Sequence, residues 1–485
     1  MSFISVEFLI FFPVVTLLYF AAPHSARWFL LLIASCIFYM AFIPLYILVL
    51  LALIAIDYSV AIAIENSTGS RRRHFLLVSI ASLVGVLFVF KYFNFFSANM
   101  ALVSAFFDWK YPVGLLTLAL PIGLSFHTFQ SLSYVFEVYR GKQKAERHLG
   151  IYALYVMFYP QLVAGPIERP QHLLHQFYEI HSFDYDRIKT GLLRMVWGFF
   201  KKVVVADRLG LVVDYVFLQP SAYHGVPLVI ASIFFTLQLF FDFSAYCDIA
   251  LGAAQVMGFT LVENFNRPFR AHSIVEFWRR WHISLSSWFR DYFFLPLAFS
   301  WRRFGFLCIP FATLITFLVT GFWHGANWTY GIFGLLHGGY IVVGEATRNA
   351  RERIAALIGL PSVPRLHALV QNLCVFLLMT VSCIFFRAVS LSDALYTVTH
   401  LFSGLRISDI GHLQSLIGIS SHAFAITCTL ALIVFLVEHL HENKGPFQLI
   451  AERVWYVRWP LYWALTLSIL VFFVPGNTQF IYFQF

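Results

Sequence analysis

Runs of about 20 nearly uncharged apolar residues recur along this chain, and they limit its possible folds more than any other feature. Phe304–Trp323 is one such run and contains no charged side chain. About eleven segments qualify as candidate membrane spans. The runs have helical length and rarely alternate in polarity, so they predict an all-α polytopic membrane protein. The clearest candidates are Phe8–Ala22, Trp28–Ile43, Leu45–Ile64, Phe75–Phe93, Leu228–Met257, Phe304–Trp323, Leu369–Phe386 and Trp459–Val474.

The composition agrees with this class. Hydrophobic residues make up 60% of the chain and charged residues 12%, whereas a soluble domain is roughly half apolar and about a quarter charged. The net charge of +9 resides in short basic clusters between apolar runs, which is typical of membrane orientation signals and argues against a nucleic-acid partner. The six cysteines are scattered within apolar segments, so they predict neither a zinc site nor a disulfide framework.

The basic clusters also predict an orientation. Arg71–Arg73 follow the third span and Arg140–Arg147 the fifth, which places both loops in the cytoplasm and the N-terminus outside. The N-terminal apolar segment has no basic region before it and no small-residue cleavage site, so we expect a first span and no removable signal peptide. Beyond about residue 165 the pattern is too irregular to assign sides.

We expect one integral membrane domain over residues 1–485, because no internal repeat or low-complexity linker divides it. Its parts would be an N-terminal helical scaffold (1–165), a catalytic region (166–345) that holds the unusual polar residues, and a C-terminal scaffold (346–485). The polar stretch Ile167–Lys189 predicts an amphipathic or interfacial element. Val113–Phe136 and Ile151–Val163, which contain Pro121, Gly123 and Pro160, predict kinked or re-entrant segments.

His324 is the first candidate functional residue. It follows the apolar run Phe304–Trp323 directly, and a titratable group beside bilayer-embedded sequence is a functional-site hypothesis by default. Gly321, Gly325 and Asn327 interrupt the helix around it, as in segments that line protein or a cavity. The glycines that follow, such as Gly334, would let a further helix carrying His337 pack closely.

His282 is the second candidate. It lies in Glu276–Leu297, where tryptophan, arginine and histidine alternate as in an interfacial amphipathic helix. On a continuous helix it shares a face with Trp278 and Ser286, and this aromatic strip with a hydroxyl favours a functional role. Arg290 and Asp291 are placed to form an ion pair.

Two acids lie within the apolar segment Leu237–Gly252. Gln238 and Asp242 are four residues apart and share a helix face, whereas Asp248 points elsewhere. Carboxylates in a span are costly against lipid. They could therefore bind neighbouring helices, or they could orient the histidine site or line a polar tunnel, and spacing alone leaves both open.

Other chemistries have less support. His172 and His175 could share a helix face, and His439 and His441 flank Leu440, but neither pair has a convincing third ligand, so we expect no metal. The sequence has no Gly-x-Ser-x-Gly elbow, P-loop or dinucleotide fingerprint.

Several blocks in order resemble the membrane-bound O-acyltransferase family, in particular its bacterial branch typified by the alginate O-acetyltransferase membrane subunit. The resemblance covers most of the chain and is specific because the blocks recur in the family's order. They are LPIGLSFHTFQSLSYVFEVYRG (Leu120–Gly141), FYPQLVAGPIER (Phe158–Arg169), LFFDFSAYCDIALG (Leu239–Gly252), NFNRPF (Asn264–Phe269), EFWRRWHISLSSWFRDY (Glu276–Tyr292), GFWHGANWTY (Gly321–Tyr330), FFRA (Phe385–Ala388) and FIYFQF (Phe480–Phe485).

The resemblance implies a ring of about eleven or more helices with broken segments around a central tunnel. The family's near-invariant histidine corresponds to His324, and its upstream histidine or asparagine to His282. Residues expected to line the tunnel or support these two are Asn327, Asp242, Gln238, Trp281, Trp323, Arg279, Arg280, Ser286, Arg290 and Asp291.

The implied reaction is acyl transfer from a thioester to a hydroxyl, with His324 as general base and His282 as a positioning group. The anionic donor, acetyl-coenzyme A or an acyl carrier protein, could be attracted by Arg279, Arg280, Arg302 and Arg303. This donor is a co-substrate, and we expect no bound cofactor. The family branch implies the bacterial inner membrane and the O-acetylation of a secreted or cell-surface polysaccharide such as alginate. A periplasmic acyltransferase partner and membrane lipids are the further contacts expected.

Two rival classes remain at this level. A transporter or flippase of an envelope precursor also contains broken helices and buried charge, but it should show internal repeats with paired interruptions, and none is visible here. A structural subunit of a secretion complex would tolerate changes at both histidines.

Overall fold

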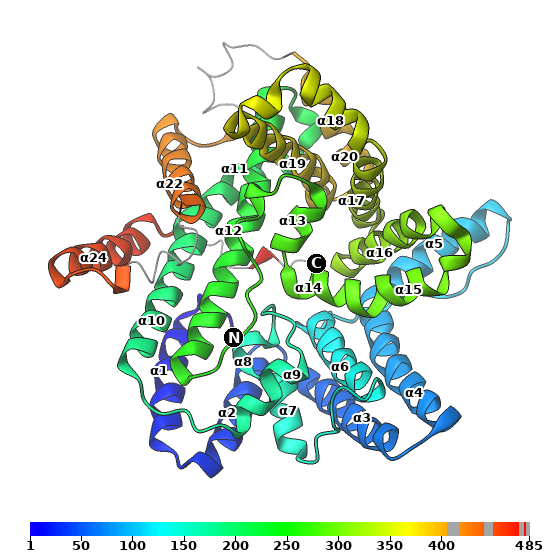
Figure 1. Cartoon of the computed structure of the whole chain (residues 1–485), viewed down its shortest axis with the longest axis vertical. Coiled ribbons are helices and arrows are strands. Elements are labelled where there is room, and N and C mark those ends of the chain that lie inside the picture. Colours follow the sequence, from blue (N-terminus) through cyan, green and yellow to red (C-terminus); the bar gives the residue numbers. More distant parts are fainter. Residues whose placement is uncertain (405–416, 441–449, 475–479, 482–485) are drawn as a thin grey trace. The chain divides into compact units, whose positions relative to one another are not determined.

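The computed structural model describes residues 1–404, 417–440, 450–474 and 480–481. Throughout this described part, the regular elements are helices (Figure 1). The chain forms two compact units, and each is described by itself. The first comprises residues 1–195 and 249–262, and the second residues 196–248 and 263–485. The long helix α12 (Val226–Met257) contributes residues to both.

Six described helical stretches are long and apolar enough to cross a membrane. The protein is therefore a multi-pass membrane protein, as the apolar runs predict. The shorter helices α1 (Val6–Ala21) and α2 (His24–Met40) are also apolar. The six stretches are Pro44–Glu65, Gly69–Phe106, Val226–Met257, Arg302–His324, Pro364–Arg387 and Ser421–Glu438.

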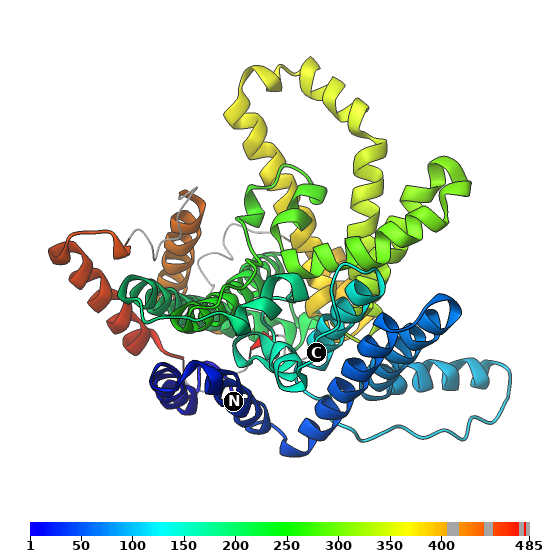
Figure 2. The same ribbon diagram turned by 60° about the horizontal axis from the view of Figure 1, so that its bottom comes forward.

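The first unit is built on α1, α2 and a group of longer helices. In this group α3 (Ile47–Glu65) packs against α4 (Gly69–Leu87) and α6 (Leu124–Tyr139), and Figure 2 shows α3 and α4 side by side in blue. A π-helical turn joins α4 to α5 (Phe93–Phe106), so the predicted span Phe75–Phe93 is part of a longer helix. Shorter helices complete the unit up to α10: α7 (Leu149–Met157), α8 (Tyr159–Leu162), α9 (Pro170–Leu173) and the start of α10 (Tyr185–Phe200).

The predicted break near Pro121 and Gly123 is confirmed. Gly123 has φ 78°, a left-handed conformation that glycine adopts at no steric cost, and α6 begins directly after it. A side chain at Gly123 would also meet the carbonyl oxygen of Leu162 at 2.7 Å. The first half of the apolar run Val113–Phe136 is therefore non-helical and the second half is α6.

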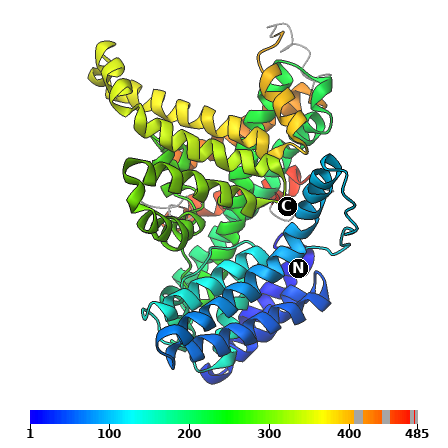
Figure 3. The same cartoon turned by 90° about the vertical axis from the view of Figure 1, so that its right-hand side faces the viewer.

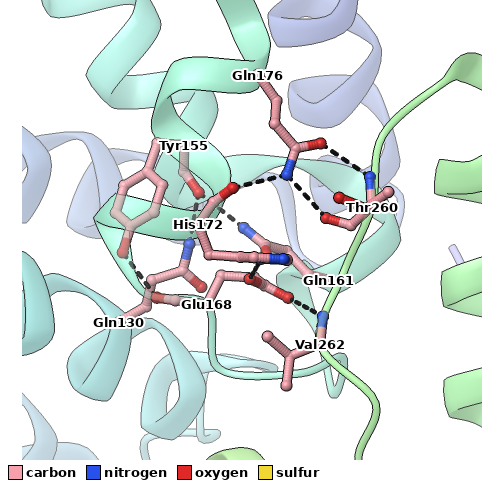
Figure 4. A network of polar contacts seen from close by, with 8 residues as sticks. All are labelled: Gln130, Tyr155, Gln161, Glu168, His172, Gln176, Thr260 and Val262. Carbon is pink, nitrogen blue, oxygen red and sulfur yellow. Dashed lines mark hydrogen bonds and ion pairs between the residues drawn. The ribbon is translucent and has the colours of Figure 1, made fainter.

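The polar stretch Ile167–Lys189 is not one amphipathic helix. It contains the single-turn α9, a 3₁₀ segment (Leu174–Tyr178), extended backbone and the start of α10. Figure 4 shows the hydrogen bonds that hold its first part. The buried carboxylate of Glu168 accepts from the backbone N–H of Val262 (2.6 Å) and bonds the Nδ1 of His172 (2.7 Å). The carboxamide of Gln176 pairs with both backbone groups of Thr260.

This network continues into α6 and α7. The carboxamides of Gln130 and Gln161 donate to the carbonyl of Tyr155 (2.5 and 2.7 Å), and the Tyr155 hydroxyl donates to the carbonyl of Glu168 (2.8 Å) (Figure 4). Because buried polar groups need partners, these bonds fix non-helical backbone within the unit.

The second unit contains the segments that carry the predicted site. Its helices after α10 are η4 (Lys201–Ala206), α11 (Asp207–Phe217), α12, α13 (Ile274–Arg280), α14 (Ile283–Phe289), a π-helical turn (Arg290–Phe294), α15 (Leu295–Ser300), η8 (Arg302–Leu307), α16 (Cys308–His324), α17 (Trp328–Ala346), α18 (Arg348–Leu357), α19 (Pro364–Arg387), α20 (Leu391–His400), α22 (Ser421–Leu440) and α24 (Trp455–Phe472). In Figure 3, α17 and α19 run side by side towards α18.

Helices α16 and α17 pack at very short range, as the glycine pattern predicts. A Cβ atom on Gly334 would lie 2.1 Å from the carbonyl oxygen of Phe317, and one on Gly321 would lie 2.2 Å from that of Tyr330. Only glycine fits at these two positions without moving a backbone. The two helices form a hairpin, and His324 lies at its turn.

Candidate active site

His282 lies in the sharp turn between α13 and α14 and is fully buried. Its backbone has φ 44° and ψ 54°, the left-handed region, which costs a residue other than glycine about 1–3 kcal/mol. The prediction that Trp278, His282 and Ser286 share one helix face is therefore wrong, because α13 ends at Arg280 and α14 begins only at Ile283. The indole N–H of Trp278 instead donates to Nδ1 of His337 (3.3 Å), and the Ser286 hydroxyl donates to the Trp281 carbonyl (3.1 Å).

His324 is the last residue of α16 and is 5% exposed. Gly325 follows in an extended conformation, and Asn327 then caps α17 by accepting the backbone N–H of Thr329 (3.1 Å). The amide of Asn327 donates to the carbonyl of Val389 (3.1 Å). Asn327 thus serves as a helix cap, and a role in positioning substrate stays a prediction.

Trp323 brings the two histidines into one cluster. The centroid of its ring lies 5.9 Å from the imidazole of His282 and 4.8 Å from that of His324. The indole is 4% exposed. Two histidines from sequence blocks about 40 residues apart thus contact the same aromatic side chain, as a shared site requires.

The rest of the surroundings is also aromatic. The ring of Phe243 on α12 meets His282 edge-on at 4.6 Å. Phe386 at the end of α19 and Phe333 on α17 meet His324 at 5.2 and 5.8 Å. Such walls exclude water and strengthen electrostatic interactions inside the site. Burial lowers the pKa of His282 to about 3, so this imidazole is neutral at pH 7 and a weak base.

Comparison with known proteins identifies the family. Residues 16–391 match MBOAT, the membrane-bound O-acyltransferase family. The chain belongs to the membrane-bound O-acyltransferase family. A probable alginate O-acetylase of Pseudomonas putida is 34% identical over 443 residues, which are 90% of this chain and 87% of the relative. A peptidoglycan O-acetyltransferase of Helicobacter pylori is 30% identical over 94% of this chain and 91% of its own length.

A teichoic acid D-alanyltransferase of Streptococcus thermophilus is similar over a shorter region, with 30% identity over 48% of this chain and 59% of the relative. The chain is therefore a membrane-bound O-acyltransferase, as the ordered motifs predict. The family match includes both histidines and Trp323.

The acyltransferase holds its two predicted intramembrane acids in ion pairs. Asp242 pairs with Lys202 (2.8 Å), and Asp248 pairs with Lys201 (2.8 Å). Lys202 also contacts Asp207 (2.7 Å) and Lys201 also contacts Glu438 (2.8 Å). The second carboxylate oxygen of Asp242 accepts the backbone N–H of Ile481 (2.7 Å). These contacts support the alternative in which the acids bind neighbouring helices.

Sequence reasoning overlooked Lys201 and Lys202, which are both buried. A signal was available, because two lysines precede a valine run in a chain whose apolar segment Leu237–Gly252 holds two acids. Gln238, one helical turn before Asp242, is half-buried on α12.

The remaining predicted residues differ in their surroundings. Trp281 is buried and stacks on Phe277 at 5.4 Å. Arg280 pairs with Glu276 (2.8 Å), and the predicted ion pair between Arg290 and Asp291 is present at 2.8 Å. Among the arginines predicted to act at the site, Arg279, Arg290, Arg302 and Arg303 are exposed.

Within the described residues, no group of three histidine, cysteine, aspartate or glutamate side chains is arranged to hold a metal. His172 contacts Glu168, whereas His175 contacts Glu179 at 3.6 Å, so the two histidines have separate partners. His441 and the side chain of His439 lie outside the described residues.

Proposed function

We propose that the protein transfers acetyl groups from a cytoplasmic thioester to a hydroxyl, with His324 as general base and His282 as the positioning group. The observation that carries this proposal is the contact of both imidazoles with the single buried indole of Trp323. Acyl transfer needs a base, stabilisation of the oxyanion and exclusion of water. The aromatic walls supply the last of these.

In this mechanism, His324 takes the proton of the acceptor hydroxyl while the hydroxyl oxygen attacks the thioester carbonyl carbon. The tetrahedral intermediate collapses with cleavage of the C–S bond, and the proton passes from the imidazolium to the leaving thiolate. The products are an ester and a thiol, with no net proton consumed. His282 suits the positioning role, since burial holds its pKa far below that of a working base at pH 7.

The names of two relatives, a probable alginate O-acetylase and a peptidoglycan O-acetyltransferase, support acetyl as the acyl group. The acceptor is then a secreted or cell-surface polysaccharide, and the protein works in the bacterial inner membrane with its N-terminus outside. A periplasmic acyltransferase receives the acyl group from the protein and passes it to this polysaccharide. The exposed Arg279, Arg302 and Arg303 attract the anionic donor, either acetyl-coenzyme A or an acyl carrier protein.

The test is thiol release from acetyl-coenzyme A, and in parallel from an acetylated carrier protein, by the full chain in lipid nanodiscs. We expect His324→Ala to lower the rate by about 10²- to 10⁴-fold, because general-base catalysis contributes that much. The matched control is His175→Ala, at a side chain that is 58% exposed, which should keep the wild-type rate. Equal rates for His324→Ala and wild type, in variants that melt alike, would show that His324 is not the base.

A further inference from the structure

The fully buried Asn264 lies on the segment between α12 and α13 and contacts the chain directly after His282. Its backbone carbonyl accepts the N–H of Ile283 (3.0 Å), and its side-chain oxygen accepts the N–H of Ser284 (3.1 Å). One residue therefore satisfies the first two backbone donors of α14. These donors have no partner within their own helix.

This arrangement replaces an ordinary helix cap. The N-cap residue usually accepts the N–H of the second or third helical residue with its own side chain, and serine, threonine, aspartate and asparagine are preferred there. His282 occupies the N-cap position of α14, and its side chain makes no cap hydrogen bond. Asn264 supplies the cap from another segment, and the imidazole of His282 packs against Phe243 and Trp323.

The same segment holds the other side of the turn. The backbone N–H of Asn266 donates to the carbonyl of Arg280 (2.9 Å), two residues before His282. A left-handed conformation persists only where the surroundings determine it on both sides. Here Asn264 and Asn266, two residues apart in one segment, bond the backbone on either side of His282.

The carboxamide of Asn264 also fixes the position of this stretch against α12. Its nitrogen donates to the sulfur of Cys247 (3.5 Å), and Cys247 lies one helical turn after Phe243. Phe243 in turn contacts the His282 ring at 4.6 Å. The turn and the ring it carries are therefore held against the same face of α12.

We propose that Asn264 is the positioning residue for His282: it caps α14 in place of the histidine and locks the left-handed turn that directs the imidazole towards Trp323. This inference rests on the proposed function, since it assigns His282 a part in the reaction. Asn264 itself touches no reacting atom. Asn264 affects the turnover rate only by positioning the imidazole of His282.

The test is a double-mutant cycle on thiol release by the full chain in nanodiscs, with the donor that the wild type uses. Asn264→Leu removes the side-chain cap at similar size, and we expect kcat to fall about tenfold or more with KM nearly unchanged. In a His282→Asn background the same change should alter kcat by less than about threefold, because asparagine tolerates the left-handed turn and can cap its own helix. Equal losses in both backgrounds would overturn the proposal.

Ser390→Ala is the matched control, because Ser390 caps α20 by accepting the N–H of Asp393 (3.1 Å) in the same unit. It should lower the melting temperature without changing kcat. Asn264→Asp keeps the oxygen that accepts from the N–H of Ser284, so its kcat should stay within about threefold of wild type. An inactive Asn264→Asp variant together with an active Asn264→Leu variant would contradict the proposal.

Hydrogen exchange separates this inference from the proposed function. In Asn264→Leu, the amides of residues 283–286 should exchange faster than in wild type, whatever the donor or the activity. Unchanged exchange there would overturn the role of Asn264 as the cap. If exchange rises as expected and His324→Ala keeps its activity, the proposed reaction mechanism fails and the cap stands.

Discussion

Glu168 in the first unit and His282 in the second are both buried polar side chains, and their surroundings are opposite in kind. One carboxylate oxygen of Glu168 accepts from the backbone N–H of Val262, and the other bonds Nδ1 of His172, so this residue holds the local backbone in place. His282 and His324 are instead surrounded by the rings of Phe243, Trp323, Phe333 and Phe386. The first arrangement holds backbone in place through hydrogen bonds, and the second packs two imidazoles among aromatic rings.

The comparison predicts that changes at Glu168 affect stability and not turnover. Glu168→Leu leaves the buried N–H of Val262 without its acceptor, and we expect the free energy of unfolding to fall by about 1–3 kcal/mol. The rate of thiol release per folded molecule should stay at the wild-type level. Thermal unfolding in nanodiscs, measured beside the rate, checks both quantities.

Glu179→Leu is the matched control, because Glu179 faces His175 at the same i, i+4 spacing but is 56% exposed. Its effect on stability should be close to zero. If Glu168→Leu folds like wild type but loses turnover, Glu168 would contribute to catalysis, and the proposed contrast with His282 and His324 would be wrong.

A second prediction concerns the pH dependence of catalysis. Since burial holds the pKa of His282 at about 3, this group stays neutral from pH 5 to 8 and contributes no inflection there. We expect His282→Asn to lower the rate by about tenfold through lost positioning, while the shape of the pH–rate profile over this range is kept. An inflection that is present in wild type and absent in His282→Asn would assign the titrating group to His282.

The smallest expected effect is at His172. The hydrogen bond to Glu168 raises the pKa of His172, while burial raises that of Glu168. A raised histidine pKa contributes stability that is complete below about pH 6.5 and is lost as the pH rises through the folded-state value. We expect wild type to exceed His172→Gln in stability by less than about 1 kcal/mol at pH 6, because the side chain is 40% exposed.

This difference in stability should shrink towards pH 9, and unfolding at both pH values measures it. A difference that grows with pH would mean that the charged pair does not stabilise the fold.

The sequence predicted the helical class and long apolar spans such as Phe304–Trp323, because apolar run length is a local signal. Not all of the roughly eleven predicted spans are long enough in the structure, which has six such helical stretches among its described residues. The catalytic roles of His282 and His324 stay predictions.

The sequence also predicted the close approach of α16 and α17 from glycines. The left-handed turn at His282 was not predicted, since it depends on Asn264, which lies 18 residues earlier. The lysine pairs were missed for the same reason, because Lys201 finds Asp248 and Glu438 only in the folded chain.

The pairing of Lys201 also has a consequence for biogenesis. Glu438 follows Lys201 by 237 positions, so a ribosome makes most of the second unit before the lysine has both acidic partners. Until α22 emerges, Lys201 can pair with Asp248 but lacks its second acidic partner, Glu438. The buried contact between Lys201 and Glu438 therefore forms late in synthesis, and chains that end before α22 lack it.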